Sequence, residues 1–595
     1  MWLKIRVCCH AATVVILLCL HHLDQHGVDA NRAAGRARTN AKRTRVHNGK
    51  TSKPTRTGDQ IVMRAGVSWN TRMDTIQLTG TYGTVKEEKK VPKEHKNTQP
   101  PNVILIVADD LGFNDVGYHG KYNRAVISTP NIDALAYSGV RLENYYVQPV
   151  CTPTRSQLLT GRYQIHTGMQ HVNLFPGRPC CLPLDETTLA QALKRLGYST
   201  HIVGKWHLGY AWKDCLPSRR GFDSFFGNIM GSADHWSHNK TSFFDNKAVV
   251  GKSMYFNERL YWKHEGTFST ILYTNRARQL IRKQPRNKPL FLFISFEAVH
   301  TPLNPPHDYT DPYNDIIQNS KRRRYAGLVN ILDEAVKNIT EALKYNNLYD
   351  NSVIIFTTDN GGRPKPRSVG NNWPLRGGKS TLWEGGIRGV GFVHSPLIPY
   401  DMRGTVNREL IHVSDWFPTI VKGIAGGKLV TRKPLDGVNQ WKTIRKGAQS
   451  KRKEILHNID PVYVPAAWTS ENERHFGKLE NLPFNATIRA SIRVGKWKLS
   501  TGLPHEDYWE PPKESGLPTE TNAIRWSTPV RLYNIHRDPN ERQNVARYHK
   551  KTVYRLLKRL QDYQNTAVRP MYMGEKDWRG SPEHHGGAWV PWMDV

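Results

Sequence analysis

The sequence predicts an α/β fold: a large, mixed and mostly parallel sheet flanked by helices, followed by a smaller C-terminal α+β domain. The first observation is a set of continuous apolar runs rich in β-branched and aromatic residues, a pattern typical of strands buried on both faces. The second is that helical patterns separate these runs, as in a sheet covered by helices on both sides. The runs lie at 103–107, 201–203, 290–294 and 353–356.

Helical segments between these runs complete the alternation. One is predicted at 187–196, and a shorter one at 156–162 follows Cys151. The clearest is 324–343, where apolar residues recur three or four positions apart and form one face. The chain of 595 residues is long enough for one large core and a second, smaller domain.

The end of the chain has a different pattern. Short strands are predicted within 488–499 and at 530–535, followed by a helix at 551–563. We therefore place a catalytic domain at 99–450 and a smaller C-terminal domain with a tail at 451–595.

The N-terminal region resembles a secretory leader. Residues 1–30 contain basic Lys4 and Arg6, an apolar run at 8–20 and a small-residue cleavage site, and are predicted to be a signal peptide. The apolar run is shorter than the roughly 20 residues of a membrane-spanning helix, so no stable span is expected in the mature chain, with a signal anchor as the alternative. Residues 31–98 are polar and basic and are predicted to be a flexible linker or pro-region.

The charge balance predicts an anionic partner. The chain carries 85 Lys and Arg against 51 Asp and Glu, a net charge of +34. Such an excess favours nucleic acid, acidic membrane or acidic polysaccharide, although a basic surface can also serve only solubility. A nucleic-acid role conflicts with the secretory signal, which leads to a lysosomal or extracellular location. Three glycosylation sequons agree with this route: Asn239, Asn338 and Asn485.

Cysteines are too few for a disulfide scaffold. The mature chain keeps Cys151, Cys180, Cys181 and Cys215. One bridge among the last three is the simplest arrangement, and Cys151 then stands apart.

Polar residues follow each predicted strand. Because ligands bind beyond the carboxyl ends of parallel strands, we expect these residues to share one site. Taken singly, each has an ordinary structural explanation as a turn, a cap or a solvated side chain. They are Asp109 and Asp110 after the first strand, Lys205 and His207 after the second, His300 after the third, and Asp359 and Asn360 after the fourth.

The residue types predict a metal-assisted hydrolase of an anionic ester. The carboxylate and amide oxygens are ligands that Ca²⁺ or Mg²⁺ prefers, and no zinc-like Cys/His spacing occurs. Three cations, Arg155, Lys205 and Lys379, would hold an oxyanion beside the metal. These features do not distinguish sulfate from phosphate.

The segment around Cys151 adds a family resemblance. Cys151-x-Pro153-x-Arg155, continued to Arg162, resembles the sulfatase signature, and 204–209 matches a second sulfatase motif. The resemblance covers roughly 99–570 and implies an alkaline-phosphatase-like sulfatase fold. Four further segments resemble the arylsulfatase B, I and J branch, which includes the N-acetylgalactosamine-4-sulfatases: 372–379, 382–386, 457–461 and 532–539.

The resemblance implies a mechanism. The family converts the motif cysteine, here Cys151, to formylglycine by means of a formylglycine-generating enzyme. The hydrated aldehyde attacks sulfur, the alcohol leaves, and the second hydroxyl expels sulfate, which is covalent catalysis in two steps. The implied ligands of one Ca²⁺ are Asp109, Asp110, residue 151, Asp359 and Asn360.

The same resemblance implies roles for the remaining site residues. Arg155 would orient formylglycine, and Lys205 and Lys379 would bind sulfate. His207 would accept the proton of the second hydroxyl, and His300, with Lys379, would bind substrate and protonate the leaving oxygen.

The implied substrate is a sulfated glycosaminoglycan, with the 4-sulfate of N-acetylgalactosamine in dermatan or chondroitin sulfate as first choice. The alternatives are an I/J-like arylsulfatase with another sulfated substrate, a related phosphoesterase and a non-catalytic polysaccharide-binding protein. The resemblance also implies a Cys181–Cys215 disulfide, with Cys180 as a spare thiol. The basic loop 363–367 is expected to grip a polyanion. The oligomeric state is left open.

Overall fold

The computed structural model describes residues 99–120, 126–363, 369–463, 476, 478–503, 508–520, 528–571 and 575–594. The predicted signal peptide at 1–30, the predicted linker at 31–98 and most of the basic loop 363–367 lie outside these residues. Within them, no helix is both long and apolar enough to cross a membrane.

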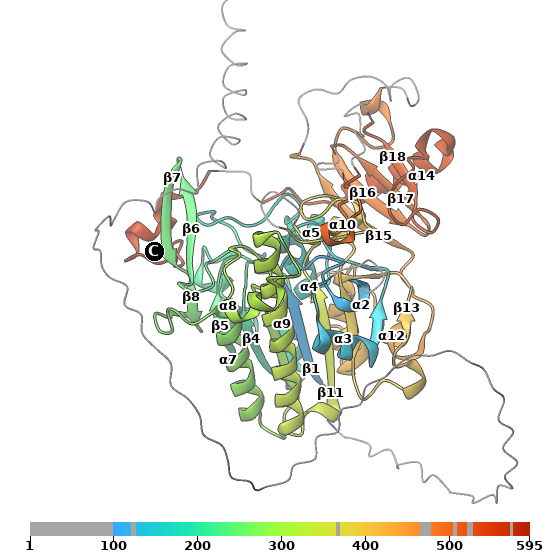
Figure 1. The fold of residues 1–595 in the computed structure, drawn as a ribbon. Helices are drawn as coiled ribbons and strands as arrows, with labels where there is room; N and C mark the ends of the chain where they lie inside the picture. Colours follow the sequence, from blue (N-terminus) through green and yellow to red (C-terminus); the bar gives the residue numbers. More distant parts are fainter. Residues whose placement is uncertain are drawn as a thin grey trace, which may run out of the picture. The chain divides into compact units, whose positions relative to one another are not determined.

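The catalytic part is built on one ten-stranded sheet (Figure 1). Its strands, in order across the sheet, are β13 (Val406–Asn407), β2 (Val140–Leu142), β12 (Gly391–His394), β11 (Ser352–Thr358), β1 (Asn102–Ala108), β10 (Leu290–Ser295), β4 (Ser199–Gly204), β5 (Ser224–Asn228), β8 (Met254–Phe256) and β9 (Arg259–Leu260). The five strands from β11 to β5 are parallel to one another. Antiparallel pairs at β11–β12, β12–β2, β5–β8 and β8–β9 make the sheet mixed. The predicted fold class is confirmed.

The four predicted strands are the central neighbours β11, β1, β10 and β4. Their residues alternate between two cores, as the two-residue period of a strand requires. Val103, Leu105 and Val107 of β1 face the core formed with α4 (Cys151–Thr160) and α6 (Leu189–Arg195). Ile104 and Ile106 face the core formed with the helices on the other side.

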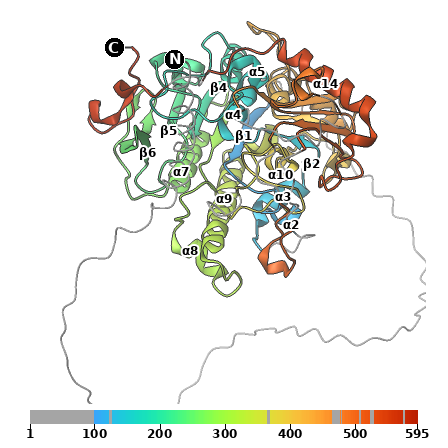
Figure 2. The same ribbon diagram turned by 90° about the horizontal axis from the view of Figure 1, so that it is seen from above.

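Helices cover that second face of the sheet. They are α3 (Pro130–Tyr137), α7 (Ser269–Lys283) and α9 (Ser320–Tyr345), and α7 and α9 lie side by side (Figures 1 and 2). Helix α9 begins a few residues before the predicted 324–343, because Asn319 caps it by accepting from the backbone of Arg322, and it also ends slightly later.

Helix α4 differs from the expected 156–162 because it begins at Cys151 itself. Pro153 is the third residue of this helix, which ends at Thr160. The backbone N–H at that position has no partner inside a helix, so proline is tolerated there.

The C-terminal part holds a separate antiparallel sheet. Its order is β15 (Glu454–Asp460), β16 (Arg489–Val494), β17 (Trp497–Thr501) and β18 (Arg531–Asn534), and α14 (Lys550–Gln564) packs on it through Val553, Leu556, Leu557 and Leu560. This confirms the smaller α+β domain.

Shorter elements complete the described chain. They are α2 (Gly117–Gly120), α5 (Gln164–Thr167), α8 (His307–Thr310), α10 (Glu384–Ile387), α11 (Trp416–Pro418), α12 (Trp441–Lys446), the pair β3 (Tyr145–Tyr146) and β14 (Ile411–His412), and the hairpin β6 (Asn239–Phe244) and β7 (Lys247–Lys252).

Candidate active site

The carboxyl ends of the four central strands bring most of the predicted site residues together. Asp109 and Asp110 directly follow β1, and Asp359 and Asn360 directly follow β11, its parallel neighbour. Lys205 follows β4 at once, whereas His300 lies five residues beyond β10. The backbone N–H of Asp109 donates to the carbonyl of Ala298 at 2.9 Å, which ties the His300 loop to this edge.

Four of the predicted metal ligands form one buried cluster. Ligand atoms of Asp109, Asp110, Cys151 and Asp359 all lie within 4.8 Å of one another. The fifth, Asn360, donates from Nδ2 to Asp110 Oδ1 at 2.8 Å. Its own Oδ1 and Asp110 Oδ2 are buried oxygens without a hydrogen-bond partner among the described residues.

These oxygens fit a divalent cation. Buried acceptors without partners are costly, and a hard ion such as Ca²⁺ takes carboxylate and amide oxygens as ligands. The structure therefore brings together a donor set whose chemistry suits the predicted metal.

Three buried cations neutralise the three carboxylates. Lys205 Nζ lies 2.5 Å from Asp109 Oδ2, and Lys379 Nζ pairs with Asp110 Oδ1. Arg155 donates to Asp359 Oδ2 from Nη2 at 2.9 Å. Burial alone would lower the pKa of Lys205 and of Lys379, but the neighbouring carboxylates raise both, so both ammonium groups stay charged.

Cys151 lies between the two signs of charge. Its Sγ is 3.4 Å from Asp109 Oδ1 and 3.6 Å from Lys379 Nζ. Burial, reinforced by the carboxylates of Asp109 and Asp359, raises the pKa of the Cys151 thiol to about 12. Because the thiolate is the nucleophilic form of cysteine, the unmodified side chain is a poor nucleophile here.

His207 presents one unpartnered ring nitrogen. Its Nε2 lies 3.1 Å from the carbonyl of Leu174, which requires the proton on Nε2. Nδ1 is buried and makes no hydrogen bond within the described chain. Burial and the charges of Lys205 and Arg155 hold the pKa of His207 well below its usual value, so the neutral ring can accept a proton at Nδ1.

His300 has the opposite arrangement. Its Nδ1 lies 2.6 Å from the carbonyl of Thr301, so the proton sits there in the neutral ring. Its Nε2 lies 3.2 Å from Ser232 Oγ and 3.6 Å from Asp110 Oδ2. Burial lowers the pKa of His300 well below its usual value.

Two buried residues near the cluster were missed from the sequence. Ser295, the last residue of β10, accepts from Arg155 Nη1 at 2.5 Å. Glu297 accepts from Tyr273 Oη at 3.0 Å, and burial raises its pKa to about 7. Both follow the apolar part of β10, so the strand-end rule that found His300 would also have found them if applied to the nearer positions.

The other cysteines of the predicted mature chain and the sequons fall outside the cluster. Cys181 and Cys215 form a disulfide, the pair implied by the resemblance, and Cys180 is a buried free thiol. Asn239, Asn338 and Asn485 are partly exposed, and their glycosylation stays a prediction.

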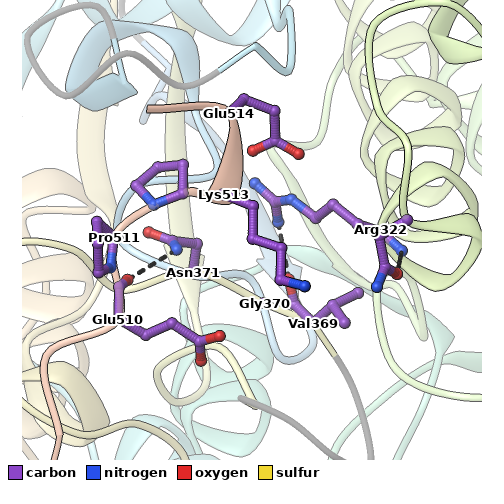
Figure 3. A pocket seen from close by; sticks show the side chains of 10 residues that line it. Arg322, Val369, Gly370, Asn371, Glu510, Pro511, Lys513 and Glu514 are labelled. Carbon is purple, nitrogen blue, oxygen red and sulfur yellow. Dashed lines mark hydrogen bonds between the residues drawn. The ribbon is translucent and has the colours of Figure 1, made fainter. Parts of the chain in front are cut away.

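A pocket away from the cluster lies where a C-terminal segment packs against the catalytic part (Figure 3). It is lined by the start of α9, residues 369–371 and the C-terminal segment 510–514. Arg322 donates to the carbonyl of Val369 at 2.9 Å, and Asn371 donates to the carbonyl of Glu510 at 3.0 Å. None of the predicted catalytic residues lines it.

Comparison with known proteins decides the family. The sequence model of the Sulfatase family matches residues 101–424. The chain is also 47% identical to arylsulfatase J of Mus musculus over 505 residues, which cover 83% of this chain and 81% of that protein. The chain belongs to the sulfatase family. This sulfatase is therefore an enzyme that hydrolyses sulfate esters, not a non-catalytic binding protein.

Two further relatives extend the comparison. Human N-acetylgalactosamine-6-sulfatase is 29% identical over 458 residues, covering 75% of this sulfatase and 81% of the relative. The crystal structure of Ps i-CgsB in complex with k-i-k-neocarrahexaose shares 28% identity and a TM-score of 0.64, covering 81% of this sulfatase and 97% of that chain.

Proposed function

We propose that this sulfatase removes sulfate from glycosaminoglycan sugars, with N-acetylgalactosamine 4-sulfate of dermatan or chondroitin sulfate as the first candidate. We further propose that it uses one Ca²⁺ and a formylglycine made from Cys151. The observation that carries the proposal is the buried cluster in which Cys151 lies among three carboxylates and three cations.

The metal would be held by Asp109, Asp110, Asp359 and Asn360, together with residue 151. When bound, Ca²⁺ supplies Lewis-acid stabilisation of sulfate oxygens, and formylglycine supplies a hydroxyl nucleophile that a buried thiol does not. The unpartnered oxygens of Asp110 and Asn360 support this assignment.

The three cations would bind and position. Lys205 and Lys379 bring buried ammonium groups to the cluster, where hydrogen bonds to sulfate oxygens are strongest because water is excluded. Arg155 is held by Asp359 and Ser295, so its guanidinium is fixed next to residue 151 and would orient it.

The two histidines would move protons at different nitrogens. Nδ1 of His207 would take a proton from the nucleophilic group, because its Nε2 proton is committed to Leu174. Nε2 of His300 would deliver one to the leaving oxygen. A bound sulfate ester brings a negative charge that raises the pKa of His300, so this proton becomes available when substrate is present.

A different sulfated sugar is the second candidate. It is favoured by the 47% identity to arylsulfatase J and by a relative named for the 6-sulfate of N-acetylgalactosamine. Both candidates are consistent with synthesis through the secretory pathway, where a formylglycine-generating enzyme would act, and with a lysosomal or extracellular destination.

The test joins two measurements on protein secreted by cultured cells. Mass analysis of the peptide containing Cys151 should show formylglycine, and the same protein should release sulfate from a 4-sulfated N-acetylgalactosamine disaccharide faster than from the 6-sulfated isomer. A faster rate on the 6-sulfated isomer would replace the first candidate by the second. Unmodified cysteine throughout, with no sulfate released, would refute the proposal. Cys180→Ala is the matched control, since Cys180 is the other buried free thiol of the described chain.

A further inference from the structure

Two residues near His300 take no part in the mechanism above. Ser232, an exposed residue beyond β5, places Oγ 3.2 Å from Nε2 of His300. Its carbonyl accepts from Nζ of Lys240, a partly exposed residue of β6, at 3.3 Å. The ammonium group of Lys240 is therefore separated from the His300 ring by a single residue.

Lys240 has no counterion in direct contact among the described residues. Where the structure describes the chain, its ammonium group makes no ion pair, and its one hydrogen bond goes to the carbonyl of Ser232. Burial, followed by the positive charge of Lys205, lowers the pKa of Lys240 to about 8, so the group is still mostly charged at neutral pH. The buried carboxyl of Glu297 acts in the opposite direction and raises this pKa, but it makes no ion pair with Lys240 within the described chain. A cation that lies close to other cations and has no paired carboxylate is a favourable position for an anion.

The position of Lys240 is built into the fold. Strand β6 pairs with β7, with Lys240 opposite Gly251. The C-terminal tail then fixes the hairpin, because Trp589 donates from Nε1 to the carbonyl of Lys240 at 2.9 Å and from its backbone to Lys252 at 2.9 Å. Trp589 is itself fully buried.

A second cation, from the C-terminal tail, contacts the same face of β6. Nζ of Lys576, from the tail, donates to Oγ of Ser242 at 3.0 Å. Ser242 is two residues beyond Lys240, so both side chains lie on one face of the strand, about 7 Å apart along it. Asn239, the predicted glycosylation site, lies on the other face, so a glycan there need not cover Lys240.

We propose that Lys240 is a specificity-determining residue that binds a second anionic group of the substrate, a carboxylate or sulfate close to the sulfate that is cleaved. Lys576 extends this cationic face toward the next anionic group of a polymer. The inference rests on the proposed function and deepens it. It defines the substrate as a sulfate ester with a neighbouring negative charge, whereas an aryl sulfate that carries no second charge would not engage Lys240.

The test compares Lys240→Met with wild type on substrates that differ in their second charge. The panel contains 4-methylumbelliferyl sulfate, a monosulfated disaccharide with its uronic acid carboxylate, the same disaccharide with the carboxylate reduced to an alcohol, and a disulfated sugar without a carboxylate. We expect kcat/KM to fall about tenfold, through KM, on the substrates with a second charge, and less than about twofold on the aryl sulfate.

The substrates of the panel distinguish a carboxylate from a sulfate as the group that Lys240 binds. A loss on the carboxylate disaccharide that disappears after reduction assigns the carboxylate, and a loss on the disulfated sugar assigns sulfate. Lys247→Met is the matched control, because Lys247 lies on β7 of the same hairpin and is largely exposed, and it should leave kcat/KM unchanged on every substrate. Melting temperatures of both variants verify folding.

An equal loss on all substrates would overturn the role of Lys240 while leaving the proposed function intact. The failure of the proposed function has a different signature, because the wild-type enzyme would then release no sulfate from the sugar members of the panel.

Discussion

Two buried clusters in this sulfatase both combine carboxylates with cations, but they differ in how many of their buried oxygens have a partner. At the joint between the catalytic and C-terminal parts, Lys498 of β17 lies 3.0 Å from Glu384 and 2.8 Å from Glu541, and all three side chains are fully buried. The remaining oxygens of the two carboxylates accept from Tyr146 Oη and from the backbone of Glu384, each at 2.7 Å. Every carboxylate oxygen of this joint cluster therefore lies within 3.0 Å of a cation or a hydrogen-bond donor, although Glu541 Oε1 makes an ion pair with Lys498 and no hydrogen bond among the described residues.

The active-site cluster is different because it leaves acceptors open. Asp110 Oδ2 and Asn360 Oδ1 have no hydrogen-bond partner in the part of the chain that is described, although both are buried. A network whose polar groups are all paired stabilises one arrangement of the fold. A network with unpaired buried acceptors leaves those acceptors available to bind a ligand. The difference predicts that substitutions in the first cluster change stability and those in the second change activity.

The largest effect is expected from Cys151→Ala. Loss of the precursor of the nucleophile should lower kcat on an aryl sulfate by about 10⁴-fold or more. The melting temperature should change little, because the thiol makes only weak contacts with Asp109 and Lys379. A large drop in melting temperature together with residual activity would contradict the proposed separation of roles.

Lys498→Met should have the converse effect. It leaves the carboxylates of Glu384 and Glu541 buried without a cation, which costs about 3–5 kcal/mol of the free energy of unfolding. Denaturant unfolding measures this loss, while kcat of the folded fraction should stay near the wild-type value. If kcat falls as strongly as stability does, the two clusters are coupled.

Asn360→Ala tests the open acceptor. Removing Oδ1 should weaken Ca²⁺ affinity by at least about tenfold, because one ligand of the proposed site is lost. The measurement is the rise in melting temperature of EDTA-treated protein as Ca²⁺ is added, with Asn144→Ala, in the turn between β2 and β3, as control. A wild-type protein whose melting temperature and activity ignore both EDTA and Ca²⁺ would argue against the metal site.

The smallest effect concerns the pH dependence of stability at Glu143, whose ion-pair partner Arg388 also pairs with Glu384 of the joint cluster. Burial alone would raise the pKa of Glu143, but the hydrogen bond and charge of His119 and the charge of Arg388 lower it to about 2, below its usual 4.5. A depressed carboxyl pKa stabilises the fold above pH 4.5, and this contribution is lost as the pH falls toward 2.

Glu143→Gln should therefore lower the free energy of unfolding by about 1–3 kcal/mol at pH 7, and the difference from wild type should shrink between pH 4.5 and 2. Unfolding curves across this range provide the check. A difference that does not depend on pH would show that packing, not charge, is responsible.

The active-site cluster and the joint cluster also differ in how far the sequence alone predicts them. The four central strands and the residues that follow them were predictable, because apolar runs and strand direction are local properties. Lys498 was not, since a lysine in a short C-terminal strand has the pattern of a solvated residue and its burial depends on Glu384 and Glu541. Lys240 was missed for a related reason: only the β6–β7 hairpin and Trp589 place it near His300.

The sequence by itself determined the fold class, the family and the identities of the residues at the strand ends. It could do so because parallel neighbours deliver their carboxyl ends to one edge of a sheet. Only the tertiary structure decided which oxygens are left open, which ring nitrogen of each histidine carries the proton, and that Cys151 begins its helix. These properties depend on contacts between segments far apart in the chain, such as Lys379 with Asp110, which no local pattern records.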